Sequence, residues 1–262
     1  MTLRLIDSHC HLDDAAFDAD RAAVLARAAA VGIEAIVLPA VTAASWPRMR
    51  TVAASDPRLY ASYGLHPMFM AKHRPEHLDA LPGWLERERP VAVGECGLDF
   101  YIDDPDRAAQ ERYFDAQLGI ARDFDLPVIV HSRKANDEVT KYIRRHPGVR
   151  GVIHSFSGSE QQARRLIDLG FCLGLGGPIT HARARRLHRL VAELPLEALL
   201  AETDAPDQPG SAHRGQRNEP GFLPEVIETM ARLRDVAPED IAAATCENAR
   251  RLFNLPLQDR PA

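Results

Sequence analysis

The length, composition and charge of the chain fit one ordinary globular domain. It has 262 residues, of which 45% are hydrophobic and 26% charged, enough for a single large core. The net charge of −5 excludes a generally basic nucleic-acid coat protein. The N-terminus has no basic segment followed by an apolar run, and no uninterrupted apolar stretch is long enough to span a bilayer. We therefore expect a cytoplasmic protein with no membrane partner.

Eight short apolar segments, each ending in polar residues, are predicted to be strands. Their aliphatic and β-branched runs are typical of strands buried on both faces of a parallel sheet. They are Leu3–His11, Glu34–Ala40, Leu59–His66, Val91–Asp99, Pro127–Arg133, Arg150–Phe156, Phe171–Gly176 and Ala198–Asp204. Stretches of helical periodicity lie between them, most clearly Asp20–Val31 and Arg107–Phe124. Strands that alternate with helices predict parallel βαβ units.

Eight such units closing on themselves predict an α/β fold, the TIM (β/α)₈ barrel. We expect residues 1–262 to form a single domain with a core of about residues 3–255. An extra helical tail is expected from about Pro224 to Phe253. The alternative is an open doubly wound sheet, but neither a GxGxxG motif nor a P-loop follows the first predicted strand.

The first predicted strand ends in a His-x-His pair, within Asp7-Ser8-His9-Cys10-His11. Alternation along a strand would place His9 and His11 on one face, toward the barrel axis, where two imidazoles can share a metal ion. Taken alone, the pair could equally be two histidines that bond to carboxylates or water. Asp7 lies deeper, so we expect it either to orient a ligand histidine or to be a structural hydrogen-bond acceptor.

Four other predicted strands also carry a histidine or a carboxylate at or near their C-terminal ends. Glu95 belongs to the fourth strand, His131 to the fifth, His154 to the sixth and Asp204 to the eighth. Barrel enzymes hold their sites at these strand ends. Six such groups converging without a metal would be poorly satisfied. Four histidines and two carboxylates without a thiolate suit Zn²⁺, Mn²⁺ or Mg²⁺.

Two ions fit this set of ligands better than one. Glu95 can bridge them, and the other five ligands then divide into His9, His11 and Asp204 on one ion and His131 and His154 on the other. Two ions roughly 3.5–4 Å apart lower the pKa of a bound water and hold the attacking and leaving oxygens. Asp204 could also accept the proton of that water as general base. We therefore predict two divalent ions per chain, with Glu95 and Asp204 taking part in catalysis.

Taken together, these motifs resemble the TatD family of metal-dependent deoxyribonucleases, within the amidohydrolase-like superfamily, over nearly the whole chain. The matching stretches are Asp7-Ser8-His9-Cys10-His11-Leu12, Gly64-Leu65-His66-Pro67, Gly94-Glu95-Cys96-Gly97-Leu98-Asp99, His131-Ser132-Arg133, His154-Ser155-Phe156-Ser157-Gly158, Glu202-Thr203-Asp204-Ala205-Pro206 and Arg217-Asn218-Glu219-Pro220. The resemblance implies this same ligand set with Glu95 bridging, at a position where many amidohydrolase relatives carry a carbamylated lysine. It also implies exonuclease-like hydrolysis of DNA, at single strands or DNA ends.

Two residues beside the ligands are candidates for contact with a substrate phosphate. The resemblance places His66 near that phosphate, where it could donate a hydrogen bond to a developing oxyanion. The alternative for His66 is a structural role. Arg133 shares the inward parity of His131 and could bind a phosphate oxygen, unless it pairs with Asp99 or Glu202.

The loop after the eighth predicted strand, His213–Pro220, is a third candidate. Polar loops over a barrel mouth often bind substrate, so Arg217 and Asn218 are predicted to contact it, with anchoring of the loop as the alternative. The arginine-rich segment His181–Arg189 could follow a nucleic-acid backbone, but a solvated helix face is the simpler interpretation.

By themselves the residues establish only metal-assisted hydrolysis. The resemblance selects DNA as the substrate. The alternative is a metal-dependent deacylase or amidohydrolase that cleaves an ester or amide, such as an aminoacyl-tRNA bond, since fold and ligands would serve it equally. A phosphate-binding mouth would favour the nuclease, whereas a carboxylate pocket or an apolar acyl pocket would favour the deacylase. The sequence is compatible with a monomer.

Overall fold

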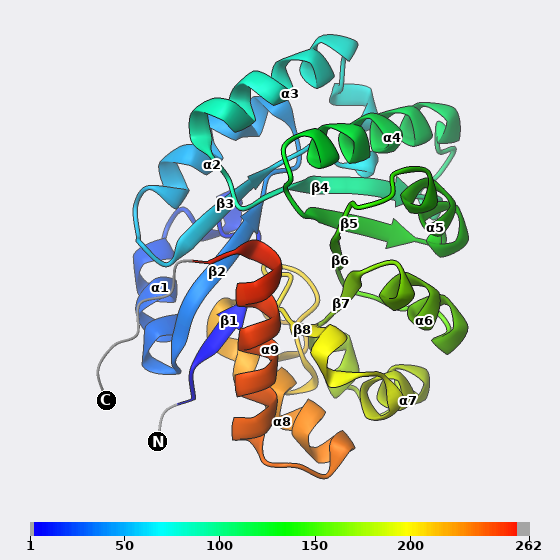
Figure 1. The fold of residues 1–262 in the computed structure, drawn as a ribbon. Coiled ribbons are helices and arrows are strands. Elements are labelled where there is room, and N and C mark those ends of the chain that lie inside the picture. The colour runs from blue at the N-terminus through cyan, green and yellow to red at the C-terminus, as the bar shows by residue number, and fades with distance from the viewer. Residues whose placement is uncertain (1–2, 256–262) are drawn as a thin grey trace.

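The computed structural model describes residues 3–255, and within them eight parallel strands form a single sheet in the order of the sequence. The sheet curls into a nearly closed barrel with helices around its outside (Figure 1). The strands are β1 (Leu5–Asp7), β2 (Ile33–Pro39), β3 (Leu59–Tyr63), β4 (Ala92–Asp99), β5 (Val128–Arg133), β6 (Gly151–Ile153), β7 (Phe171–Leu175) and β8 (Leu199–Ala201). The predicted single-domain (β/α)₈ barrel is confirmed.

The connections between the strands are helical, as the periodicity predicted. The helices are α1 (Arg21–Ala30), α2 (Trp46–Ala53), α3 (Pro75–Glu88), α4 (Arg107–Asp123), α5 (Asn136–Arg145), α6 (Glu160–Asp168), α7 (Arg185–Glu193), α8 (Leu223–Arg234) and α9 (Pro238–Phe253). The predicted C-terminal tail is thus two helices, because Asp235 adopts a left-handed conformation (φ 54°) that ends α8. The described residues contain no helix long and apolar enough to cross a membrane.

The buried side chains form two clusters, and their positions show which end of the barrel is open. The larger cluster packs the strands against the outer helices. The smaller one lies inside the barrel and joins inward-facing residues such as Ile6 and Ile129 to Leu252 and Phe253 of α9. Figure 1 shows α9 lying across β1 and β8, which it contacts. The interior is therefore filled and covered by α9, and the opposite end, where the strands end, remains open for a site.

Several strands end earlier than the sequence predicted. The strands β1, β3, β6 and β8 stop at Asp7, Tyr63, Ile153 and Ala201, so several of the predicted site residues lie in the loops that follow them. At two of these loops the backbone leaves the strand through a left-handed residue, Ser155 (φ 45°) or Asp204 (φ 58°). Such residues cannot continue a strand. Apolar sequence alone does not reveal these turns.

Candidate metal centre

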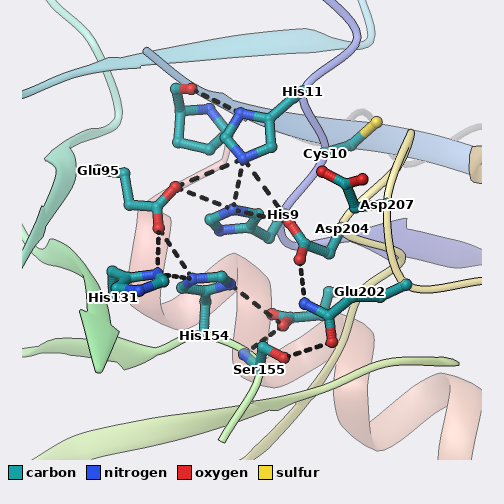
Figure 2. A network of polar contacts seen from close by, with 12 residues as sticks. His9, Cys10, His11, Glu95, His131, His154, Ser155, Glu202, Asp204 and Asp207 are labelled. Carbon is teal, nitrogen blue, oxygen red and sulfur yellow. Dashed lines mark hydrogen bonds and ion pairs between the residues drawn. The ribbon is translucent and has the colours of Figure 1, made fainter. Parts of the chain in front are cut away.

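All six predicted ligands converge at the C-terminal end of the barrel (Figure 2). Glu95 projects from within β4 and His131 from β5, whereas the other four lie just beyond strand ends. Gly97 allows the close pairing of β4 with β5, because a Cβ there would lie 2.1 Å from the carbonyl oxygen of His131. The strand pairing and the loops therefore bring together residues that are up to 195 positions apart, the separation of His9 and Asp204.

The first group of ligand atoms has the spacing expected around one ion. His9 Nε2 and His11 Nε2 are 3.3 Å apart, and Glu95 Oε2 lies 3.3 and 3.5 Å from them. Asp204 Oδ1 lies 3.5 Å from His9 Nε2 and 3.6 Å from His11 Nε2. Ligands about 2.1 Å from a tetrahedral ion are roughly 3.4 Å from each other. These four atoms fit a single divalent ion.

The second group is built around the other oxygen of Glu95. Glu95 Oε1 lies 3.2 Å from His131 Nδ1 and 2.8 Å from His154 Nε2, and these two nitrogens are 3.1 Å apart. The ring of His154 stacks on that of His9, with centroids 3.9 Å apart, which ties the two groups together. A carboxylate that offers one oxygen to each group has the arrangement of a bridging ligand.

The burial of Glu95 supports a bound cation at this place. Its side chain is 1% exposed, and neither oxygen accepts a hydrogen bond of good geometry, although histidine nitrogens surround both. Burial by itself would raise the pKa of Glu95, but the neighbouring His66, His154 and His9 outweigh it and lower the pKa well below its ordinary value. A buried anion that lacks aligned donors needs a positive partner. The residues therefore fit divalent ions.

His66 lies directly beside this centre. Its Nδ1 accepts a hydrogen bond from Met68 N (3.1 Å), so the proton resides on Nε2, which lies 2.9 Å from Glu95 Oε1. Burial lowers the pKa of His66 to about 4, which keeps the ring neutral at pH 7. Its position beside Glu95 and His131 would also suit a metal ligand, but a ring that carries its proton on Nε2 is a hydrogen-bond donor there.

Two buried carboxylates lie behind the ligand histidines, and one of them is hydrogen-bonded to its histidine. Asp99 Oδ2 lies 2.9 Å from His131 Nε2, which leaves His131 Nδ1 for the ion. Glu202 Oε1 lies 3.7 Å from His154 Nδ1, on the ring edge opposite Glu95, which is too far for a hydrogen bond. A carboxylate bonded to a ligand histidine, as Asp99 is to His131, fixes the tautomer of the ring and raises its basicity. From the sequence, Asp99 and Glu202 are expected only as possible partners of Arg133, and no sequence signal places them behind the histidines.

Asp7 is a structural acceptor, one of the two roles expected for it. Its Oδ2 accepts from Thr203 Oγ1 (2.5 Å), and its Oδ1 accepts from Thr203 N (3.0 Å) and from the backbone N of His9 (3.3 Å). Burial raises the pKa of Asp7 to about 7, against the opposing effect of the Thr203 hydrogen bonds. Asp7 thus holds the loops after β1 and β8 together and does not touch an imidazole ring.

Asp204 has a partner that the sequence did not suggest. While Oδ1 faces His9 and His11, Oδ2 accepts a short hydrogen bond from Gln208 Nε2. Gln208 Oε1 in turn accepts from Ser155 Oγ (2.9 Å). Burial raises the pKa of Asp204 to about 6, opposed mainly by His154. Gln208 therefore holds the carboxylate in place between the ligand group and the loop after β6.

The centre opens into a pocket of about 660 Å³. His66 and Arg133 line it, together with His11, Glu95, His131, His154 and Asp204. Arg133 pairs with neither Asp99 nor Glu202 among the ion pairs of the described residues. Two of the predicted phosphate-contact residues therefore face the space next to the ligands.

Arg217 and Asn218 are not among the pocket-lining residues of the described chain. Arg217 makes a two-pronged ion pair with Asp20, at 2.8 and 2.7 Å. Asn218 is 2% exposed and donates from Nδ2 to the carbonyl oxygens of Thr203 and Asp207, both at 2.8 Å. These contacts anchor the loop after β8, and substrate contact by the two residues stays a prediction.

The fold and its centre define the class of metal-dependent hydrolases, and comparison with known proteins specifies the family. The family model described as TatD related DNase matches residues 6–254. The Escherichia coli protein YjjV, described as an uncharacterized metal-dependent hydrolase, is 43% identical over 98% of this chain and 100% of its own. The crystal structure of YjjV superposes with a TM-score of 0.93 at 42% identity, covering 98% of this chain and 100% of that one. The chain belongs to the TatD family of metal-dependent hydrolases.

One relative has a more specific description. The Salmonella typhimurium protein described as a 3'-5' ssDNA/RNA exonuclease, TatD, is 33% identical over 96% of this chain and 99% of its own. The phosphotriesterase homology protein from Escherichia coli is only 15% identical, at a TM-score of 0.69 over 97% of this chain and 99% of that one, and therefore shows the shared fold alone.

Proposed function

We propose that this protein is a metal-dependent exonuclease that hydrolyses phosphodiester bonds of single-stranded DNA or DNA ends with two divalent ions. The observation that carries the proposal is the divided ligand set, in which each oxygen of Glu95 faces a separate group. Two ions so held would activate a water molecule and offset the charge of the phosphate. The exonuclease among the relatives supports the choice of substrate.

The chain's own residues have distinct tasks in this proposal. Asp204 accepts the proton of the attacking water, a role helped by a pKa that burial raises to about 6. His66 donates from Nε2 to the oxyanion that develops on phosphorus, because its Nδ1 is occupied by Met68 N. Arg133, a residue of the pocket wall, binds a phosphate oxygen. Arg217 and Asn218 would contact substrate only if the loop after β8 rearranged.

The test is digestion of end-labelled single-stranded DNA by purified protein loaded with Mg²⁺, Mn²⁺ or Zn²⁺. We expect the labelled strand to shorten, and the reaction to stop when a chelator is added. Glu95→Ala and His154→Ala should abolish it, since each removes a ligand that holds an ion. Intact DNA in the presence of all three metals would contradict the proposal. The cytoplasmic location and the monomeric state stay predictions.

A second candidate, hydrolysis of an ester or amide, is favoured by the character of the pocket wall. One side is apolar, with Leu175, Ile179 and Leu187, and carboxylates such as Asp207 stand at the same pocket. Such a wall would accept an acyl group as readily as a nucleobase. Turnover of model esters that is lost in Glu95→Ala, with DNA left intact, would select this deacylase or amidohydrolase.

A further inference from the structure

An exposed aromatic ring lies at the rim of the barrel, beside the metal centre. Tyr101, two residues after the end of β4, is 51% exposed. The guanidinium carbon of Arg133 lies 3.9 Å from the centroid of its ring, and Lys134 Nζ lies 4.5 Å from the same centroid. The three residues are called the rim cluster below.

The two cations of the rim cluster have no anionic partner. Within residues 3–255, no carboxylate oxygen lies within 4 Å of the charged nitrogens of Arg133 or Lys134, and neither side chain makes a hydrogen bond. Lys141 on α5 differs, since it pairs with Glu138 at 2.8 Å. Two cations held over one ring and left without a carboxylate are available to an anionic ligand.

The rim cluster is tied directly to the metal centre. Asp99, whose Oδ2 faces the ligand His131, accepts with Oδ1 from the backbone N of Tyr101 (2.9 Å). The backbone N of Phe100 donates to the carbonyl oxygen of Arg133 (2.9 Å). Arg133 is also a wall residue of the pocket. Arg133 therefore connects the pocket to the Tyr101 ring.

We propose that the rim cluster is a binding platform for the nucleotide that follows the scissile phosphate in a single-stranded nucleic acid. The base stacks on the open part of the Tyr101 ring, while Arg133 contacts the scissile phosphate and Lys134 contacts the next phosphate along the strand. Stacking on an aromatic ring combined with cationic backbone contacts is the usual mode of binding single strands, and it tolerates any base. The proposal rests on the proposed nuclease function, and it adds where the rest of the strand lies.

Binding without hydrolysis gives the first test. The anisotropy of a fluorescein-labelled ten-residue oligothymidylate is measured against the protein in a chelator. We expect Tyr101→Ala to weaken binding about 5- to 150-fold, the range for loss of one base stack, and Tyr101→Phe to stay within about twofold of the wild type. Lys134→Ala should weaken binding and make its salt dependence less steep by about 0.7, the slope of one phosphate contact on a single strand.

Lys141→Ala is the matched control, because Lys141 also lies near a tyrosine ring, at 5.7 Å from Tyr142, but is already paired with Glu138. It should bind the oligonucleotide like the wild type. With metal present, Tyr101→Ala should raise the KM for the oligonucleotide and leave kcat/KM for bis(p-nitrophenyl) phosphate, too small to reach the rim, within about twofold.

The outcomes separate the platform from the nuclease proposal. Equal affinity of Tyr101→Ala and the wild type for the oligonucleotide would overturn the platform. Failure of the wild type to bind the oligonucleotide would also overturn it, as would displacement of the bound oligonucleotide by a polyglutamate peptide at equal charge concentration. A strand that binds in a Tyr101-dependent way but stays intact with metal would leave the platform standing and refute the nuclease.

Discussion

Replacement of Asp99 tests whether a buried carboxylate controls metal binding through a ligand histidine. Asp99 is fully buried, and its Oδ2 lies 2.9 Å from His131 Nε2 while Oδ1 accepts from the backbone N of Tyr101 and of Ile102. In Asp99→Asn one oxygen becomes an amide that donates. The amide nitrogen faces either the backbone donors or the imidazole. If it faces the imidazole, it donates to His131 Nε2 and favours the tautomer with the proton on Nδ1, the atom that would bind the ion.

The expected cost follows from these contacts. Loss of such a carboxylate behind a ligand histidine lowers metal affinity about 10- to 100-fold. If the amide instead faces the backbone N of Tyr101 and Ile102, these unsatisfied buried donors should lower the free energy of unfolding by about 1–3 kcal/mol. Titration calorimetry of the metal-free protein with Zn²⁺ or Mn²⁺ measures the first quantity, and urea denaturation measures the second.

The chain supplies a matched control for this experiment. Asp115 Oδ1 lies 2.8 Å from His146 Nε2, a carboxylate–histidine pair of similar length that lies outside the pocket lining. Asp115→Asn should leave metal affinity unchanged. If Asp99→Asn binds both ions with wild-type affinity, then His131 is not held by Asp99 in the metal-bound protein and the reasoning is refuted.

Two further predictions concern the loop after β8 and the support of the centre. Asn218→Ala should lower the free energy of unfolding by about 1–3 kcal/mol, because the buried carbonyl oxygens of Thr203 and Asp207 lose their hydrogen-bond donor. A raised KM at unchanged stability would instead indicate that Asn218 contacts substrate. Gly174→Ala should destabilise by about 1–3 kcal/mol, since the new Cβ would lie 2.0 Å from Glu202 Oε2. Gly119→Ala in α4, whose new Cβ would meet nothing closer than 3.8 Å, should raise the free energy of unfolding by about 0.5–1 kcal/mol. Equal effects at both glycines would show that the contact with Glu202 does not limit residue size at Gly174.

The barrel and its ligands could be predicted because the relevant signals are local. Runs such as Val128–Val130 are apolar on both faces, which marks a strand of a covered parallel sheet. Parallel strands also end on one side of a barrel, so His131 and Glu95 had to approach each other whatever the details of packing. For these features, knowing the order of the elements was sufficient.

The partners of the ligands could not be predicted, because they depend on the pairing register and on loop conformation. The register of β4 and β5 sets Gly97 beside His131 and Asp99 beside Arg133, and the fold then turns Asp99 toward His131. Gln208 reaches Asp204 through a loop that contains left-handed residues. Strand ends were predicted too late for a related reason, since hydrophobicity does not mark the residue at which pairing stops.

The distribution of the ligands along the chain has a consequence for how the barrel holds together. His9 and His11 follow the first strand and Asp204 follows the last, and these two strands meet where Ser8 N donates to the carbonyl oxygen of Ala201 (3.1 Å). An ion bound by these residues would cross-link the first and last strands, where the barrel closes. Loading with metal should therefore slow amide hydrogen exchange most at β1 and β8. In a chain cleaved between β4 and β5, bound ions should keep the two fragments associated as one barrel.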